Sequence, residues 1–191
     1  VLENEQAFPP KEIIKKDISY TVNELIERTL KYSDNLADEL LLEYIGFLDQ
    51  ENDLVAEVYK DLGIFNVYDV KSSAVSVKAY ASIFRMLYNS SFLNKDNSEK
   101  LLNILSKNTF NAGIKAGLPE GIRVSNKFGE RTLNATGEKQ LHDCGIVYYP
   151  DNPYLLCIMT KGRDFKNLEK IISHISRETY KEVDSRRISR E

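Results

Sequence analysis

The 191-residue chain is poor in the residues that bind metals or build disulfide frameworks. It has no tryptophan, two histidines and two cysteines. His142 and His174 are far apart in the sequence, and neither has a serine partner for a catalytic triad or the spacing of a metal cluster. Cys144 and Cys157 do not have zinc-ligand spacing either. We therefore expect no metal and no cofactor.

Long apolar runs and an excess of one charge are also absent. The chain has 26 basic and 29 acidic residues, a net charge of −3, so nucleic acid is not an expected partner. No apolar run is long enough to span a bilayer. The first residues, VLENEQAFPP, lack both a methionine and the basic-then-apolar pattern of a targeting leader.

Helical periodicity dominates the first two thirds of the chain. Thr21 and Glu24 have the spacing of a capping box, which predicts the start of a helix. Asp34 or Asn35 caps a second helix. The apolar patterns of five predicted helices cover residues 22–30, 36–48, 54–62 (ending at Gly63), 75–87 and 101–105, the last opened by Asn97 or Ser98. A crossing loop is predicted at 64–73.

The last third changes to the alternation typical of strands. Residues 122–127 alternate, and 144–150 and 154–162 predict an antiparallel hairpin around Asp151-Asn152-Pro153. The nearly continuous apolar run at 154–159 predicts a strand covered on both faces. The closing helix has an apolar stripe formed by Phe165, Leu168, Ile171, Ile172 and Ile175.

These patterns predict an α/β (α+β) fold in a single domain over residues 1–191. A helical lobe covers 17–115, an antiparallel sheet with its closing helix covers 116–183, and a charged tail at 184–191 is expected to fray. Three strands leave edges and a face to cover, so the sheet is expected to be incomplete in this chain. Cys144 and Cys157 fall on neighbouring strands; a cross-strand contact is possible, but we interpret them as small buried apolar residues.

Two short boxes carry a resemblance to a known family. Ser33-Asp34-Asn35 falls at the break between two predicted helices, and Lys127-Phe128-Gly129 lies on the first predicted strand. In this order they resemble the S-D-N and K-T-G boxes of class A β-lactamases and penicillin-binding serine hydrolases. The resemblance implies a β-lactamase/transpeptidase-like fold and an extracytoplasmic location, periplasmic or secreted. The alternative is an ordinary helix turn and a solvated lysine on a strand edge.

The resemblance also implies catalytic roles. Ser33 would relay a proton to the leaving group, and Lys127 would be the cationic anchor that keeps this proton network poised. Asp34 would point inward and tie the helix break together.

Substrate binding, by the same resemblance, would come from Asn35 and the start of the strand. Asn35 would hydrogen-bond the amide of the substrate. Gly129 would let the strand approach the substrate, and the backbone N–H of Glu130 would donate to the oxyanion. Phe128 stands where the family has a hydroxyl residue that holds a carboxylate with the lysine, so recognition of a carboxylate would depend on Lys127 alone.

Two further departures concern catalysis. No serine in the chain is followed three residues later by lysine, so the nucleophile of the S-x-x-K box is not in this chain. Its absence is expected to expose apolar surface around Leu25 and Leu41. Residues 64–73 contain no glutamate, whereas efficient class A enzymes use a loop glutamate to activate water, so slow deacylation is expected.

The resemblance therefore implies part of a serine hydrolase or acyl-transferase that acts on a β-lactam-like or peptidoglycan-like amide. Its partners would be that substrate and a missing N-terminal segment that bears S-x-x-K, with no nucleic acid and no membrane span in this chain. The chain alone is expected to be inactive. The alternative is a non-catalytic binding module that retains the cleft without the nucleophile.

Overall fold

The N-terminal part of the protein is helical, as the periodicity predicts. The computed structural model describes residues 6–50, 53–63 and 75–188, so the loop predicted at 64–73 lies outside the described residues. The capping box of Thr21 and Glu24 opens the first helix, and the Asp34 side chain caps the second. The five helices are α1 (Val22–Tyr32), α2 (Asn35–Leu48), α3 (Leu54–Asp61), α4 (Val77–Tyr88) and α5 (Lys95–Ser106).

Helix α5 begins earlier than the sequence predicted. The Asn97 N–H donates to Oδ1 of Asn94 at 2.9 Å, which makes Asn94 the N-cap. The predicted starts at Asn97 or Ser98 were wrong because the polar first turn of the helix has no apolar residue to mark it.

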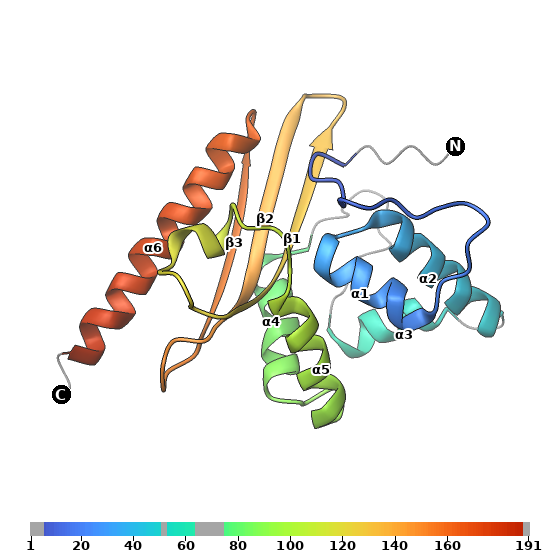
Figure 1. The fold of residues 1–191 in the computed structure, drawn as a ribbon, viewed down its shortest axis with the longest axis horizontal. Coiled ribbons are helices and arrows are strands. Elements are labelled where there is room, and N and C mark those ends of the chain that lie inside the picture. Colours follow the sequence, from blue (N-terminus) through green and yellow to red (C-terminus); the bar gives the residue numbers. More distant parts are fainter. Residues whose placement is uncertain (1–5, 51–52, 64–74, 189–191) are drawn as a thin grey trace.

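The C-terminal part contains a three-stranded antiparallel sheet in the order β1-β2-β3. Its strands are β1 (Val124–Leu133), β2 (Glu138–Val147) and β3 (Tyr154–Gly162), preceded by a short 3₁₀ helix, η1 (Ile114–Gly117), and followed by α6 (Phe165–Ile188). Figure 1 shows α6 and η1 on one side of the sheet and the other helices on the opposite side. Strand β2 begins at Glu138 rather than at the predicted Cys144.

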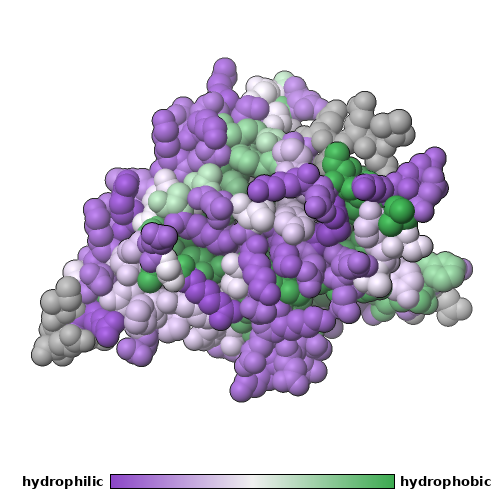
Figure 2. All heavy atoms as spheres, viewed as in Figure 1, coloured by the Kyte–Doolittle hydropathy of each residue, from purple (hydrophilic) through white to green (hydrophobic). Residues whose placement is uncertain are grey.

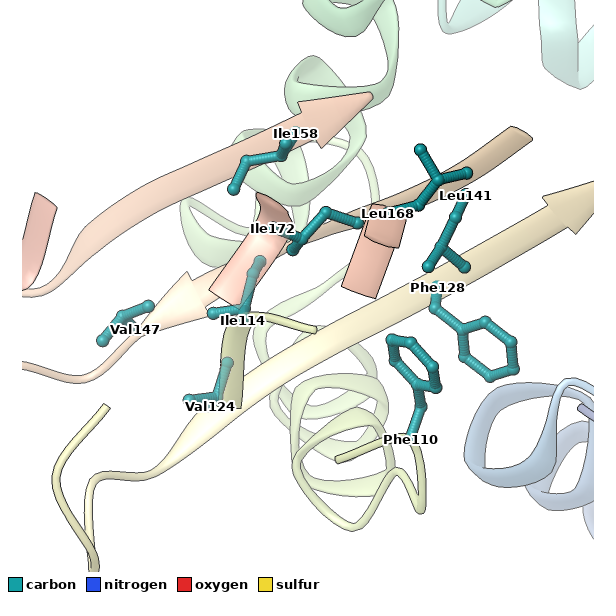
Figure 3. Close-up of a cluster of buried hydrophobic side chains, with 9 residues drawn as sticks. All are labelled: Phe110, Ile114, Val124, Phe128, Leu141, Val147, Ile158, Leu168 and Ile172. Atoms are coloured by element: carbon teal, nitrogen blue, oxygen red, sulfur yellow. The ribbon is translucent and has the colours of Figure 1, made fainter. Parts of the chain in front are cut away.

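Both faces of the sheet are packed. One core joins the sheet to η1 and α6 and includes Val124, Phe128 and Ile172 (Figure 3). The other joins the sheet to α4 and α5 around Phe84 and Leu102. Side chains of β3 contribute alternately to the two cores, which confirms the prediction of a strand covered on both faces.

The buried face of α6 differs from the predicted stripe. Leu168 and Ile172 are buried, but Ile171 and Ile175 are 46% and 39% exposed. A polar residue, Ser176, is buried instead, and its hydroxyl donates to the Ile114 carbonyl at 2.8 Å. The stripe was wrong at two positions because η1 packs on α6 and shifts its buried face.

Helix α6 also continues beyond the predicted boundary of the tail. It reaches Ile188, and the Tyr149 hydroxyl donates to the Asp184 carboxylate at 2.7 Å. The expectation that the chain frays from Asp184 was wrong up to Ile188. Charged residues continue the helix because Arg186 pairs with Glu182 one turn earlier.

Cys144 and Cys157 form a disulfide bond between β2 and β3. They are register partners with Cα atoms 4.0 Å apart, so their side chains lie on the same face of the sheet. The interpretation as two unlinked apolar residues was therefore wrong. Among the described residues, no helix is both long enough and apolar enough to cross a membrane.

Candidate active site

The turn between α1 and α2 is rigidly held. Ser33 has φ 55° and ψ 40°, a left-handed conformation that is costly for a residue with a Cβ atom. Asp34 points inward, is 1% exposed and accepts the Leu36 N–H at 3.1 Å. Its other oxygen pairs with Arg28 at 2.8 Å. These contacts fix the direction of the Ser33 side chain.

Lys127 on β1 meets this turn. Its Nζ donates to Ser33 Oγ at 2.5 Å and to the Phe128 carbonyl at 2.8 Å. The side chain is partly buried rather than extended into solvent, so the alternative of a solvated edge lysine was wrong. The two residues that the sequence assigned to catalysis are therefore in direct contact.

The environment of Lys127 brings the pKa of its ammonium group closer to neutral pH. Burial lowers the pKa of Lys127 from 10.5 to about 8, and the nearby carboxylates of Asp38 and Asp143 oppose that decrease. At pH 7 the ammonium form still predominates. A cation with such a pKa can both hold an anion and exchange a proton near neutral pH.

Asp38 is a member of this site that the sequence reasoning missed. It lies in the first turn of α2, where its N–H donates to the Asp34 carbonyl at 3.2 Å. Burial raises the pKa of Asp38, and the charge of Lys127 opposes the rise. The sequence could have indicated Asp38, because it follows Asn35 by three residues and so lies on the same face of the helix.

Tyr80 was also missed. Its hydroxyl donates to the Lys127 carbonyl at 2.7 Å and so links α4 to β1 beside the Lys127 side chain. Burial raises the pKa of Tyr80, so the phenol stays a hydrogen-bond donor. Nothing in the sequence connects two residues that are 47 positions apart.

A buried carboxylate supports β1 from the opposite face. The Asp143 carboxylate accepts hydrogen bonds from Nδ2 of Asn126 at 2.9 Å and from the Ile114 N–H at 2.8 Å. Burial raises the pKa of Asp143 to about 6, against the lowering effect of both hydrogen bonds. A Cβ at Gly113 would lie 2.2 Å from the Asp143 carboxylate, so only glycine fits there. This cluster fixes the segment before η1 to the strand of Lys127.

Phe128 differs most from its expected role. The side chain is 3% exposed and stacks on Phe110, with ring centroids 4.3 Å apart. Lys127 Nζ is 5.2 Å from the centroid of the Phe128 ring. Phe128 therefore belongs mainly to the core, because strand alternation turns it to the face opposite Lys127.

Gly129 and Glu130 lie at the outer edge of β1. A Cβ on Gly129 would have no atom within 4 Å, so this position is open. The Tyr148 N–H donates to the Arg123 carbonyl, so Arg123 and Tyr148 form a hydrogen-bonded pair of the antiparallel ladder. Such pairs alternate with pairs that share no hydrogen bond, and the unbroken register places Glu130 and Leu141 in a pair of the second kind. The backbone N–H of Glu130 consequently points to the open edge, as an oxyanion donor must.

The N-terminal segment lies between the two boxes. The Gln6 side chain donates to the Ser33 carbonyl at 2.6 Å and accepts the Asn35 N–H at 3.3 Å. The Ala7 N–H donates to the Glu130 carboxylate at 2.6 Å. Asn35 itself is exposed on the first turn of α2. The structure thus brings Ser33 and Lys127 together and adds a segment, around Gln6 and Ala7, that the sequence reasoning left out.

Residues 4–183 match the sequence profile of the β-lactamase enzyme family. The chain belongs to this family. No curated protein matches the chain. The chain is similar to the structure of PBP-A, with a TM-score of 0.73 and 20% identity over 90% of this chain and 64% of that chain.

Two bacterial structures extend the comparison for this β-lactamase-family chain. A β-lactamase from Chitinophaga pinensis has a TM-score of 0.69 and 20% identity over 86% of this chain and 66% of that one. A carbapenemase from Vibrio cholerae has a TM-score of 0.68 and 22% identity over 85% and 66%. The chain thus spans 64–66% of the length of these three proteins. The helical lobe, antiparallel sheet and C-terminal helix are a β-lactamase/transpeptidase-like fold.

Proposed function

We propose that this chain is part of a serine acyl-enzyme hydrolase or acyl-transferase that acts on a β-lactam-like or peptidoglycan-like amide. The nucleophilic serine would come from an S-x-x-K segment outside these 191 residues. The observation that carries the proposal is the contact between Lys127 and Ser33 at the meeting point of the helical lobe and the sheet. The whole molecule would be an extracytoplasmic enzyme.

In this mechanism the nucleophilic serine gives its hydroxyl proton to the lysine of the same S-x-x-K segment, and its oxygen attacks the amide carbonyl carbon. An ester bond to the enzyme forms, and the C–N bond breaks. The leaving nitrogen needs a proton. Ser33 passes its hydroxyl proton to that nitrogen and receives one from Lys127, whose Nζ already donates to Ser33 Oγ. The Glu130 N–H stabilises the charge on the carbonyl oxygen, and Asn35 holds the substrate amide.

Deacylation is slow in this proposal. The sequence at 64–73 has no glutamate to activate water. Asp38 is a carboxylate near Lys127, but the positive charge of Lys127 keeps it a weaker base than its burial alone would make it. A long-lived acyl-enzyme is typical of transpeptidases and carboxypeptidases rather than of efficient antibiotic hydrolases.

Two surfaces that the described elements leave uncovered support the proposal that a further segment packs on this chain. Within the described residues, the outer edge of β3 pairs with no strand, and exposed Ile171 and Ile175 lie on α6, which packs on β3. Helix α2 exposes Phe47 and Leu48 by 71% and 62%, and Figure 2 shows hydrophobic atoms at the end of the molecule formed by α2 and α3. The predicted exposure was wrong at Leu25, which is buried, whereas Leu41 is partly buried and its neighbour Leu42 is 45% exposed.

The disulfide supports an extracytoplasmic location. Cys144 and Cys157 are bonded in the sheet core, and such bonds form and persist in oxidising compartments. The disulfide therefore supports the proposed location independently of the catalytic residues.

A non-catalytic binding module is the second candidate. The observation that favours it is the absence of any serine with lysine three residues later in the 191 residues. Such a module would bind the substrate through Lys127 and Asn35 without forming an ester.

A labelling experiment separates the two candidates. A fluorescent penicillin is incubated with full-length protein, with Ser33→Ala and with Ser91→Ala, an exposed serine outside the cleft. The acyl-enzyme proposal expects covalent labelling, loss of about 100-fold or more in labelling rate for Ser33→Ala, and no change for Ser91→Ala. A full-length protein with no S-x-x-K in its coding sequence and no label would favour the binding module.

A further inference from the structure

The side chain of Gln6 binds the backbone on both sides of Asp34. Its Nε2 donates to the Ser33 carbonyl at 2.6 Å, and its Oε1 accepts the Asn35 N–H at 3.3 Å. Because one side of the amide faces a carbonyl and the other faces an N–H, only this orientation of the amide satisfies both groups. One side chain therefore holds two residues, 27 and 29 positions away, to which the proposed function gives roles.

The backbone at this turn has two polar groups that the helices themselves do not pair. Ser33 is the C-cap of α1 and Asn35 is the first residue of α2, so the Ser33 carbonyl and the Asn35 N–H lie at helix ends. The Asp34 carboxylate accepts the Leu36 N–H at 3.1 Å, one residue beyond Asn35. Ser33 is also in a left-handed conformation that is costly for a residue with a Cβ atom. Gln6 supplies the hydrogen bonds that hold this conformation.

Gln6 is held in place by the two residues that follow it. The Ala7 N–H donates to the Glu130 carboxylate at 2.6 Å, which ties the segment to β1. Phe8 makes edge contacts with three rings of the core below the sheet, at centroid distances of 5.3, 5.8 and 5.5 Å to Phe110, Phe128 and Phe165. Figure 1 shows this segment, in dark blue, passing from the side of β1 to helices α1 and α2. The segment thus connects the strand of Lys127 to the turn of Ser33.

We propose that Gln6 is a positioning residue whose amide sets the direction of the Ser33 hydroxyl and of the Asn35 side chain. The inference rests on the proposed function, in which Ser33 gives a proton to the leaving nitrogen and Asn35 binds the substrate amide. Gln6 acts on both through their backbone and does not touch the reacting atoms. A displacement of about 1 Å in a group that takes part in the reaction can lower the rate about 100-fold, so the loss of Gln6 should be measurable.

Two variants separate the two hydrogen bonds of Gln6. Gln6→Met has a similar length and removes both bonds. Gln6→Glu keeps an acceptor for the Asn35 N–H but loses the donor to the Ser33 carbonyl. The control is Gln50→Met, the same chemical change at an exposed residue beyond the end of α2.

Acylation of the full-length protein by fluorescent penicillin measures rate and affinity separately. Gln6→Met is expected to lower the acylation rate constant about 10- to 100-fold and to weaken reversible binding about two- to tenfold, because Ser33 and Asn35 both lose support. Gln6→Glu is expected to show the slower acylation with an affinity within about twofold of the natural protein. Gln50→Met should match the natural protein in both constants. Natural acylation rates in the folded Gln6 variants, or equal losses of affinity in both of them, would overturn the proposal.

NMR of the 191-residue chain tests the same contacts without the nucleophile. In Gln6→Met the Ser33 hydroxyl is expected to move away from Lys127, so the pKa of Lys127 should fall below about 8. The Asn35 amide signal should shift in Gln6→Met and stay closer to its natural position in Gln6→Glu. Gln50→Met should change neither signal. An unchanged or raised pKa of Lys127 in folded Gln6→Met would overturn the proposal.

The role of Gln6 and the catalytic proposal fail separately. If the natural full-length protein is not labelled, the acyl-enzyme proposal is rejected, and the NMR titration still decides whether Gln6 positions Ser33. If the natural protein is labelled and folded Gln6→Met acylates at the same rate, the role of Gln6 is rejected and the acyl-enzyme proposal stands.

Discussion

Lys127 Nζ lies 2.5 Å from Ser33 Oγ, although 94 positions separate the two residues. The contact joins a left-handed turn between two helices to the edge strand of a sheet. Because the lysine is partly buried and donates to the serine oxygen, the proton affinity of one residue depends on the presence of the other.

The titration of Lys127 is the first prediction. NMR of lysine side chains should give a pKa of about 8 for Lys127, below the ordinary 10.5, because burial disfavours the ammonium. Ser33→Ala should lower the pKa further, because the serine oxygen accepts a hydrogen bond from the charged form. Ser91→Ala should leave it unchanged.

The same shift affects stability. The folded pKa is below the unfolded one, so the unfolded state binds more protons between about pH 8 and 10.5, and the contribution of Lys127 to stability rises across that range. In Lys127→Met this rise should disappear from urea unfolding curves. A Lys127 that titrates at 10.5 would contradict both results.

The disulfide gives the second prediction. Replacing Cys144 and Cys157 together by alanine should lower the free energy of unfolding by roughly 3 kcal/mol, because the bond closes a short loop between β2 and β3. Denaturant unfolding measures the change. A reducing agent should destabilise the natural chain by a similar amount and leave the double variant unaffected; equal sensitivity of both proteins would show that the disulfide contributes little.

Asp143 gives the third prediction. In Asp143→Asn the amide can accept from only one of its two donors, Asn126 and Ile114, so a loss of about 1–3 kcal/mol is expected. Asp151→Asn is the control, because that residue is exposed and asparagine tolerates its φ of 58°.

The pH dependence of this carboxylate has a definite sign. Burial raises the folded pKa of Asp143 to about 6 from 3.8, so the folded state binds more protons between these values. The contribution of Asp143 to stability therefore falls as pH rises from about 3.8 to about 6. Thermal unfolding of Asp143→Asn across this range should lack that fall, and an identical slope in both proteins would refute the assignment.

The exposed apolar surface of α2 gives the fourth prediction. The 191-residue chain should bind a hydrophobic dye, and Phe47→Lys with Leu48→Lys should reduce the fluorescence, because these side chains are 71% and 62% exposed. Ile13→Lys replaces an exposed apolar residue outside the helices and should change little. A stable monomer with a cooperative transition and no dye binding would argue against a missing covering segment.

Local patterns predicted the elements well where they depend on neighbouring residues. The capping box of Thr21 and Glu24 and the cap at Asp34 involve contacts within a few positions, so the sequence shows them directly. The polar first turn of α5 after Asn94 and the charged end of α6 lack apolar periodicity, so the predicted helix boundaries there were wrong. The stripe on α6 failed because η1, more than 50 positions earlier, decides which side of the helix is covered.

The site was predicted in part for the same reason. Ser33, Asp34 and Lys127 were found through two short boxes. The contact of Tyr80 with Lys127 was not found, because it depends on α4 packing against β1.

By itself, the sequence determined the helical and strand segments, the two polar boxes and the absence of an S-x-x-K serine within the chain. The tertiary structure decided that Lys127 contacts Ser33, that Cys144 bonds to Cys157, and that Phe128 stacks on Phe110 in the core. The physical reason is that hydrogen bonds, desolvation and ring contacts act over a few ångströms, and only packing of the sheet against the helices brings such distant residues within that range.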